Sequence, residues 1–333
     1  MPSPLQTTPP TRYRAVDLFA GVGGLDLHAR ELGIHVTGIE KNPDACATRR
    51  AAGLDTIQGD VRHHGPGDFP DADLLLGGPP CQPFSAAGNG AGRRALGDIV
   101  TLAQRLAARQ AVARHGHTPV DDLIRLLLEP LRWALDALDA GRPFEAIVLE
   151  QVPAVLPVWQ TYAAILRAEG YSAATGTVRA EQYGVPQTRK RAVLIARRTG
   201  TAALPAPTHR LYAKGALRTT GDPGLLPWTA MGDVLPERGR FTVVSNYGTG
   251  GDPKARGRRS SDEPSATVTG KVSRVRVLAD DGTESRFTWA EAGALQSFPA
   301  DHPWRGRDIG QQIGNAVPPR LAHHLITAAI HDS

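Results

Sequence analysis

Apolar runs alternate with segments of helical periodicity over the first half of the chain. Short runs rich in Val, Leu and Ile are each followed by a stretch whose apolar residues recur at helical spacing. This alternation is typical of parallel strands, because a parallel connection needs a crossover that is usually a helix. The pattern predicts an α/β fold with a mostly parallel, doubly wound, Rossmann-like sheet. The predicted strands end near Phe19, Glu40, Asp60, Leu76 and Glu150.

Glycine and acidic residues follow several of these strand ends. A glycine turn, Gly21 to Gly24, comes after the first strand, and Glu40 and Asp60 end the second and third. Ligands of such sheets bind at the carboxyl ends of the strands, where a glycine turn admits a ligand and a carboxylate can bind ribose hydroxyls. That much fits a nicotinamide cofactor too. The additional acid, Asp60, suits the exocyclic amine of adenine and favours S-adenosylmethionine.

Cys81 lies in the sequence GGPPCQPFS, directly after the apolar run that ends at Leu76. Prolines on both sides restrict the backbone around it, which suits a nucleophile that must meet a reacting atom closely. A free cysteine without a charged partner is more often a small buried apolar residue. Taken alone, the motif leaves both interpretations open.

The residues after Cys81 are small, glycine-rich and polar, and they predict a lid with Arg93 and Arg94 available to phosphates. Two helices are expected next, at about Ile99 to Arg114 and Pro119 to Ala140, with Thr118 as the cap of the second. We expect their apolar faces to pack against the sheet.

Beyond Glu150 the helical periodicity fades. Two strands are expected around the QTRKR stretch, and residues 199–285 are rich in Gly, Pro and Arg. This predicts a second, smaller, mainly irregular or β domain. The expected divisions are a disordered tail at 1–12, a catalytic and cofactor-binding domain at 13–190, a small target-recognition domain at 191–285, and a C-terminal segment at 286–333 that returns to the first domain.

The positive charge is concentrated in one part of the chain. The net charge is +5, but Arg189 to Arg276 holds 17 Lys and Arg against six Asp and Glu, so the remainder is mildly acidic. A basic module on an acidic body favours binding to a polyanion, because neutralised phosphates release counterions. A charged face that serves only solubility is the alternative.

Other classes of protein are disfavoured by composition. Two cysteines cannot form a disulfide framework or a structural zinc site, and the 11 histidines lack metal-ligand spacing, so we expect no metal. No apolar run approaches the length of a membrane span, and there is no charged-then-apolar leader. We expect a cytoplasmic, nucleoid-associated monomer.

Taken together, these motifs resemble those of the DNA cytosine-5 methyltransferases, in the same order from about Val16 to Leu325. DLFAGVGG resembles the cofactor loop and PPCQPFS the catalytic loop. EQV at Glu150 stands where the family usually has ENV, and Gln187, Arg189 and Arg191 match its QxRxR. The GNAVP stretch resembles the motif that closes the cofactor site.

The resemblance implies S-adenosylmethionine as cofactor and a flipped cytosine in double-stranded DNA as substrate. The implied catalytic residues are Cys81 as nucleophile, Glu150 as acid, Arg189 and Arg191. The implied cofactor-binding residues are Phe19, Gly21, Gly23, Gly24, Glu40, Asp60, Val61, Pro80, Asn315 and Val317. The expected DNA-binding residues are Ser85, Arg93, Arg94, Gln187, Asn246, Lys254, Arg256, Arg258, Arg259 and Thr267.

Three positions depart from the family pattern: Lys41 replaces an aromatic that flanks the adenine, Gln151 replaces asparagine, and Ala290 replaces an arginine. The two-helix segment before Glu150 is also longer than usual, and we expect it to serve packing. Alternatives are a tRNA cytosine-5 methyltransferase on the same catalytic domain, or a DNA-binding relative that has lost catalysis. The expected setting is a bacterial restriction-modification system, with a cognate restriction endonuclease as partner, or an orphan methylation system without one; the sequence does not distinguish the two.

Overall fold

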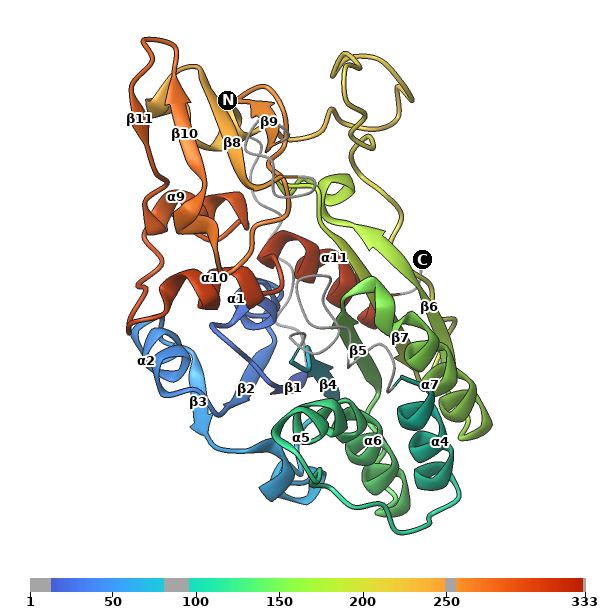
Figure 1. Cartoon of the computed structure of the whole chain (residues 1–333). Coiled ribbons are helices and arrows are strands. Elements are labelled where there is room, and N and C mark those ends of the chain that lie inside the picture. Colours follow the sequence, from blue (N-terminus) through green and yellow to red (C-terminus); the bar gives the residue numbers. More distant parts are fainter. Residues whose placement is uncertain (1–12, 81–95, 249–255, 332–333) are drawn as a thin grey trace.

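Two β-sheets form the framework of the protein (Figure 1). The computed structural model describes residues 13–80, 96–248 and 256–331. The larger sheet has seven strands in the order β3-β2-β1-β4-β5-β7-β6, and the smaller has four in the order β11-β10-β8-β9. The expected α/β fold with a large, mostly parallel sheet and a smaller β unit is confirmed.

Six strands of the larger sheet run in the same direction, and β7 alone runs antiparallel to its neighbours β5 and β6. The strands are β1 (Arg14–Leu18), β2 (His35–Glu40), β3 (Asp55–Gln58), β4 (Leu74–Gly77), β5 (Ala146–Gln151), β6 (Ser172–Arg179) and β7 (Lys190–Arg197). The central strands β4 and β5 are buried at every position, which explains why they read as continuous apolar runs.

Helices cover both faces of this sheet, because successive residues of a strand point to opposite sides. Leu75 packs on one face, while Leu74 and Leu76 pack on the other. The first face is covered by α4 (Leu96–Ala107), α5 (Pro119–Arg125), α6 (Glu129–Asp139) and α7 (Leu156–Ala168). On the second face lie α1 (Gly24–Glu31) and α11 (Pro319–Ile330). Helix α2 (Pro43–Ala51) packs at the β3 edge.

The two helices expected before Glu150 differ from the prediction in their bounds. The first ends at Ala107, and Arg109 then adopts a left-handed backbone with φ of 58°. The second is capped by Thr118 as expected, but α5 gives way to a 3-10 turn at Leu126–Leu128 before α6 begins. Pro130 in the first turn of α6 has no backbone N–H to continue α5, so the helix is interrupted there.

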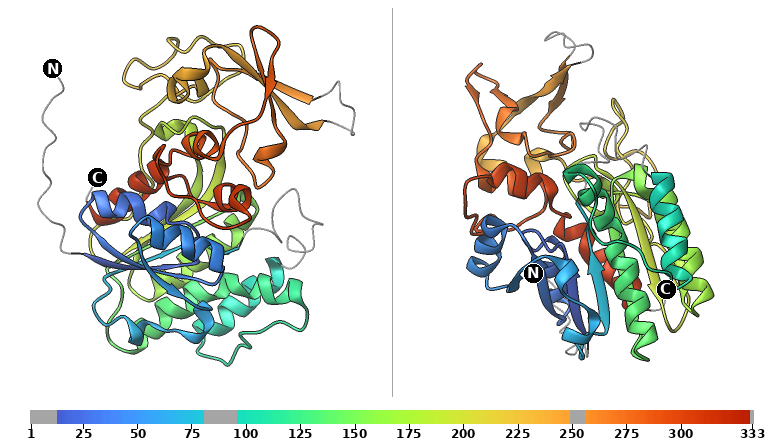
Figure 2. Two further views of the ribbon diagram at one scale, coloured as in Figure 1. Left: turned by 90° about the vertical axis from the view of Figure 1, so that its left-hand side faces the viewer. Right: turned by 60° about the horizontal axis from the view of Figure 1, so that its bottom comes forward.

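The smaller sheet has its own apolar core. It contains β8 (Phe241–Gly248), β9 (Arg256–Ser260), β10 (Arg276–Ala279) and β11 (Glu284–Ser285), preceded by the short helix α8 (Met231–Val234). The strand expected over KVSRVRVL begins late, because Val272–Arg274 form a 3-10 turn. Helices α9 (Trp289–Leu295) and α10 (Ile309–Asn315) lie between the two sheets (Figure 2). No helix within the described ranges has the length and apolar character needed to cross a membrane.

A buried ion pair ties the first βαβ unit together. Arg49 of α2 is fully buried, and its two terminal nitrogens bind the Asp26 carboxylate of α1 at 3.0 and 2.5 Å. The same side chain also donates to the carbonyls of Ala20 and Asp55 and to the hydroxyl of Thr56. All five guanidinium N–H groups therefore have acceptors, which compensates for removing the charge from water.

Replacing Arg49 by Met leaves the buried Asp26 carboxylate without its partner. We expect the free energy of unfolding to fall by about 3–5 kcal/mol, measured by urea denaturation. Arg50→Met is the control, since Arg50 is exposed on the same helix, and its cost should stay within about 0.5 kcal/mol. Equal losses for both variants would contradict this account.

Asp17 of β1 lies beside this ion pair and is also buried. Burial, and next the charge of Asp26, raise the pKa of the Asp17 carboxyl well above its usual range. The folded protein therefore keeps a proton here that the unfolded chain releases above about pH 4. The stabilisation from this group is complete below that pH and is lost as pH rises through the pKa of the folded state.

Asp17→Asn removes this titration while keeping the shape of the side chain. We expect the free energy of unfolding of the variant, relative to the wild type, to increase between about pH 5 and pH 9. Chemical denaturation across this pH range measures the difference. Parallel stability curves for the two proteins would show that Asp17 does not titrate as described.

Candidate active site

A cavity of about 340 Å³ opens at the carboxyl ends of β1, β2, β4 and β5. The structure brings most of the predicted cofactor residues together around it. Those that line the cavity are Phe19, Gly21, Gly24, Glu40, Asp60, Val61, Pro80, Asn315 and Val317. Three of the predicted catalytic residues, Glu150, Arg189 and Arg191, line the same space.

The glycine turn after β1 has an unusual backbone. Phe19 has a φ of 63°, a strained conformation for a residue with a side chain, and Gly21 has a φ of 55°. The N–H of Gly21 donates to Glu40 Oε2 at 2.8 Å, and the N–H of Asn42 donates to Oε1 at 2.6 Å. These two bonds fix the carboxylate of Glu40 at the cavity wall, where it can accept from ribose hydroxyls.

Gly23 differs from its neighbours, because it is not among the residues that line the cavity. Its φ is 93°, and a Cβ atom here would lie 2.2 Å from Leu54 Cδ1. This residue therefore shapes the turn at the start of α1. The position of Gly23 therefore does not support the prediction that it binds the cofactor directly.

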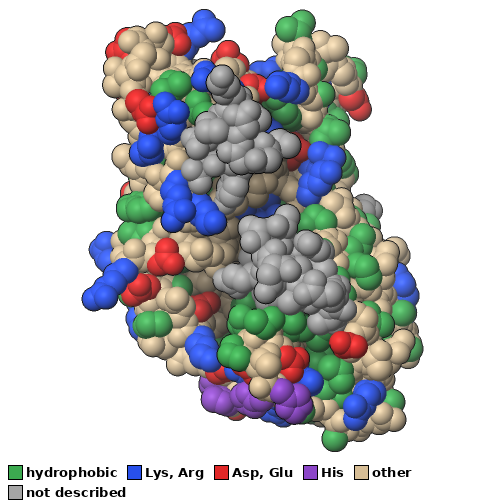
Figure 3. All heavy atoms as spheres, in the orientation of Figure 1, with side chains coloured by type: hydrophobic (Ala, Val, Ile, Leu, Met, Phe, Trp, Pro, Cys, Tyr) green, Lys and Arg blue, Asp and Glu red, His purple; other side chains and the backbone are tan. Residues whose placement is uncertain are grey.

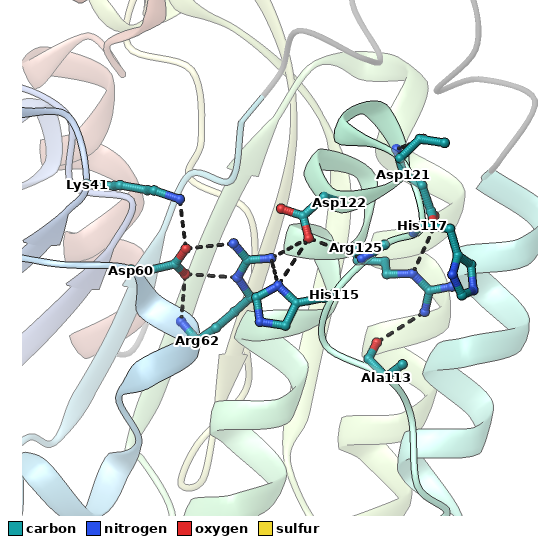
Figure 4. A network of polar contacts seen from close by, with 11 residues as sticks. Lys41, Asp60, Arg62, Ala113, His115, His117, Asp121, Asp122 and Arg125 are labelled. Atoms are coloured by element: carbon teal, nitrogen blue, oxygen red, sulfur yellow. Dashed lines mark hydrogen bonds and ion pairs between the residues drawn. The ribbon is translucent and has the colours of Figure 1, made fainter.

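Asp60 is held by two basic side chains (Figure 4). Arg62 binds it through Nε at 2.9 Å and Nη2 at 2.6 Å, and Lys41 Nζ lies 3.0 Å from Oδ2. Hydrogen bonding from Arg62 holds the pKa of the Asp60 carboxyl well below its usual range. Lys41, which replaces the aromatic expected from the family pattern, therefore contacts the predicted adenine acid directly.

Glu150 and Arg191, which both line the cavity, form an ion pair. Both side chains are largely buried, and Arg191 Nε lies 2.7 Å from Glu150 Oε1. They are adjacent because β5 and β7 are hydrogen-bonded neighbours in the sheet. A Cβ atom added to Gly78 would lie 3.9 Å from Glu150 Oε2, so this carboxylate faces the segment that leads to Cys81.

Arg189 and Gln187 face the interior between the two sheets. Arg189 donates to the carbonyls of Val268, Gly314 and Ala316 at 3.0–3.1 Å. Gln187 is fully buried and its amide donates to Leu295 and Gln296. In this arrangement Gln187 has no surface on which DNA could lie, because its polar atoms join the β7 segment to α9 and to Val268.

Gln151 takes a defined place despite its departure from the family pattern. Its Nε2 donates to the carbonyl of Pro79 at 2.6 Å, and its Oε1 accepts from the N–H of Val152. The side chain thus orients the backbone two residues before Cys81. Cys81 itself lies outside the described residues.

The predicted DNA contacts are only partly described. Ser85, Arg93, Arg94 and Lys254 lie outside the described residues, as do the side chains of Asn246 and Arg256. Arg258 is exposed on β9, whereas Arg259 donates to the carbonyls of Pro264 and Ser265. Thr267 is exposed and donates to the Thr188 carbonyl at 2.7 Å. Lys and Arg side chains gather over the smaller sheet and along the hollow beneath it (Figure 3).

The C-terminal segment completes the cavity from the far end of the chain. A Cβ atom on Gly24 would lie 2.1 Å from the carbonyl oxygen of Val317, so the two backbones touch. Thr48 of α2 donates to Gln312 Oε1 at 2.7 Å, and the N–H of Arg307 donates to Asp44. Through these contacts the C-terminal segment packs against α1 and α2, beside the larger sheet.

Some cavity residues were not predicted as site residues. Arg62, Asp122 and Leu123 line the cavity, the last two from the helical segment expected to serve packing. The sequence offers a signal only for Arg62, which follows the predicted adenine acid by two positions.

One group of described side chains has metal-ligand character. His28, Glu31 and His323 place ligand atoms within 4.8 Å of one another on α1 and α11. None of the three is among the residues that line the cavity. Metal chemistry at the candidate active site therefore receives no support from this group.

Comparison with known proteins identifies the family. The model of the C-5 cytosine-specific DNA methylases matches residues 13–100 and 144–222, about half of the chain. The chain belongs to this family. It is therefore a methyltransferase, and both family and fold imply S-adenosylmethionine as the methyl donor.

Individual relatives agree with this assignment. The chain is 29% identical to the Type II methyltransferase M1.HphI of Haemophilus parahaemolyticus, over 95% of this chain and 86% of the relative. It is 29% identical to M.AplI of Arthrospira platensis, over 92% and 82%. Among solved structures, the S. pombe Dnmt2 methyltransferase shares the fold with a TM-score of 0.62 and 16% identity, covering 96% of this chain and 98% of that one.

The cavity fits the implied cofactor. Glu40 presents a fixed carboxylate that suits ribose hydroxyls, Phe19 supplies an apolar side chain, and Asp60 can accept from an exocyclic amine if Lys41 yields its place. Gly21 and Gly24 line the cavity without side chains, so a ligand can approach the backbone of the turn there. The residues present therefore match a nucleoside with a polar tail.

Gly24→Ala should push the glycine turn after β1 away from the backbone of Val317. The added methyl would overlap the Val317 carbonyl, and such overpacking costs about 1–3 kcal/mol, so we expect cofactor affinity to fall about tenfold. Calorimetric titration with S-adenosylhomocysteine measures the change. Gly97→Ala is the control, because nothing lies within 4 Å of a Cβ at Gly97 of α4. Unchanged affinity in Gly24→Ala would contradict the contact.

Proposed function

We propose that this methyltransferase of the C-5 cytosine-specific family transfers a methyl group from S-adenosylmethionine to carbon 5 of a cytosine in a specific duplex sequence, through a covalent adduct with Cys81. The observation that carries the proposal is the buried Glu150–Arg191 pair, which faces the segment leading to Cys81 inside the cofactor cavity. The names of the relatives, which are Type II methyltransferases, favour a role in restriction and modification.

Carbon 5 of cytosine is a poor nucleophile, and this explains the need for these residue types. The thiolate of Cys81 adds to carbon 6, and the electron pair of the broken double bond moves through the ring toward nitrogen 3. Glu150 donates a proton to nitrogen 3, which leaves an enamine with a nucleophilic carbon 5. Arg191, 2.7 Å from Glu150, holds the carboxyl group in place and can contact the oxygen on carbon 2.

The cofactor supplies a methyl group on a positively charged sulfur, a good leaving group that needs alignment more than acid assistance. Loss of the carbon 5 proton to a base, expulsion of the Cys81 thiolate and return of the nitrogen 3 proton to Glu150 then restore the neutral aromatic ring and the acid. Arg189 acts as a positioning residue in this scheme, because its guanidinium binds three carbonyls of segments that close the cavity.

The target base must leave the duplex to reach this cavity. The basic stretch between Arg189 and Arg276 is suited to hold the phosphates, and the exposed Arg258 and Thr267 remain the described candidates for DNA contact. We assign recognition of the target sequence to the smaller unit, at about 191–285, in the major groove.

A mechanism-based trap tests the proposal. With cofactor and a pool of duplexes that contain 5-fluorocytosine, the wild type should form a covalent adduct, because fluorine blocks the final loss of a proton. Cys81→Ser should form none, and Glu150→Gln should slow adduct formation about 100-fold. Cys46→Ser is the control, since the buried Cys46 only donates to the Glu40 carbonyl and serine keeps that bond.

Different results would contradict different parts of the proposal. No adduct of the wild type with any duplex would contradict the covalent mechanism on DNA, and methylation of tRNA in place of DNA would contradict the substrate. An adduct with Cys81→Ser would exclude Cys81 as nucleophile. Bisulfite sequencing of DNA from cells that express the protein identifies the methylated sequence.

A further inference from the structure

The segment 113–126, which joins α4 to α6, forms part of the cofactor cavity. Asp122, Leu123 and Leu126 line the cavity together with Asp60 and Arg62. The family model matches residues up to 100 and again from 144, so it does not cover this segment. The match to the family model therefore assigns no role to this segment.

Arg62 joins the predicted adenine acid to this segment (Figure 4). Its side chain is only 4% exposed, and it binds Asp60 through two nitrogens. The third nitrogen, Nη1, donates to Asp122 Oδ1 at 2.6 Å and lies 3.0 Å from His115 Nδ1. A planar guanidinium held at both ends in this way cannot rotate away from Asp60 without losing Asp122.

The turn that follows Asp60 is also held from the helical segment. Arg114 Nη1 donates to the carbonyl of Arg62 at 2.9 Å, and Arg132 Nη2 of α6 donates to the carbonyl of His64 at 2.9 Å. The position of the turn, and with it that of Asp60 and Val61 at the cavity, depends on these contacts.

Asp122 and its neighbour Asp121 have separate partners. Asp122 accepts from the N–H of Gly116 as well as from Arg62. Asp121 instead accepts from the N–H of His117 at 2.9 Å and from Arg125 at 3.3 Å, on the side away from Arg62. Adjacent acids on one helix therefore differ in whether they connect to the cavity.

Asp60 has no spare acceptor position in this arrangement. A carboxylate has about four lone-pair sites, and Asp60 receives the Arg62 backbone N–H, two Arg62 side-chain nitrogens and Lys41 Nζ. An incoming amine must displace one of them. Lys41 is 73% exposed, whereas Arg62 is fixed by Asp122, so Lys41 is the partner that yields.

Leu123 supplies an apolar surface next to this acid. It is 37% exposed although it is a large apolar side chain, and it lines the cavity beside Asp122. An apolar wall adjacent to a hydrogen-bonding group is what binds a purine ring, because the ring face is apolar and its edge is polar.

We propose that segment 113–126 builds the adenine end of the cofactor site, with Arg62 and Asp122 as positioning residues for Asp60 and with Leu123 in contact with the purine. This inference rests on the proposed function, which supplies the adenine-containing cofactor. The bridge from Asp122 through Arg62 orients the Asp60 carboxylate toward the exocyclic amine.

Asp122→Asn tests the bridge, with Asp121→Asn as matched control. We expect the Kd for S-adenosylhomocysteine to rise about tenfold in Asp122→Asn, since a charged hydrogen-bonded partner is lost. The KM for S-adenosylmethionine should rise in parallel, while kcat at saturating cofactor and the KM for DNA stay within about twofold, because the reacting atoms are untouched. Asp121→Asn should bind as the wild type does.

Selectivity for the base gives a readout that a loss of stability alone would not produce. The wild type should prefer S-adenosylhomocysteine to S-inosylhomocysteine, which carries a carbonyl in place of the amine, and Asp122→Asn should narrow that preference. Leu123→Ser should weaken binding of both ligands by a similar factor, since the apolar contact does not distinguish them. If Asp122→Asn does not fold, Leu123→Ser still tests whether segment 113–126 contacts the cofactor.

Wild-type affinity in both Asp122→Asn and Leu123→Ser would overturn the inference. An equal loss in Asp121→Asn and Asp122→Asn would overturn the assigned bridge. Failure of the wild-type protein to bind S-adenosylhomocysteine would contradict the proposed function instead, so the two failures are distinguishable.

Discussion

The Arg49 guanidinium is the interaction on which the cofactor end of the structure depends. It joins the glycine turn through Ala20, helix α1 through Asp26, and β3 through Asp55 and Thr56. Because every N–H has an acceptor, the buried charge fixes one arrangement of these elements. Phe19 and Gly21 keep their unusual backbone because the segments on both sides of the turn are held in this way.

Backbone carbonyls held by arginines recur elsewhere in the molecule. Arg189 binds carbonyls of the segments around Val268 and Gly314, and Arg132 binds one at the turn after Asp60. In each case a buried or partly buried side chain spans elements distant in sequence. The Glu150–Arg191 pair thus lies among segments whose backbone carbonyls are bound by arginines, and Arg189 also ties Val268, beside the smaller sheet, to this region.

The sequence predicted the strand-end acids well, for a physical reason. Parallel strands place their carboxyl ends on one edge, so Glu40, Asp60 and Glu150 meet at one cavity. It did not predict Asp122 there, because helical periodicity identifies an apolar face but not which polar residue of a packed helix points toward a site. Gln187 was expected to bind DNA but is fully buried, because a motif specifies the residue type and not the direction in which its side chain points.

The contact between Gly24 and Val317 also bears on when the protein becomes active during synthesis. These residues are far apart in the chain, yet their backbones touch at the mouth of the cavity. A nascent chain that has emerged only as far as the larger sheet still lacks one wall of the cofactor site. The cofactor cavity is therefore complete only after synthesis has passed Val317, nearly 300 residues beyond the glycine turn that the same cavity needs.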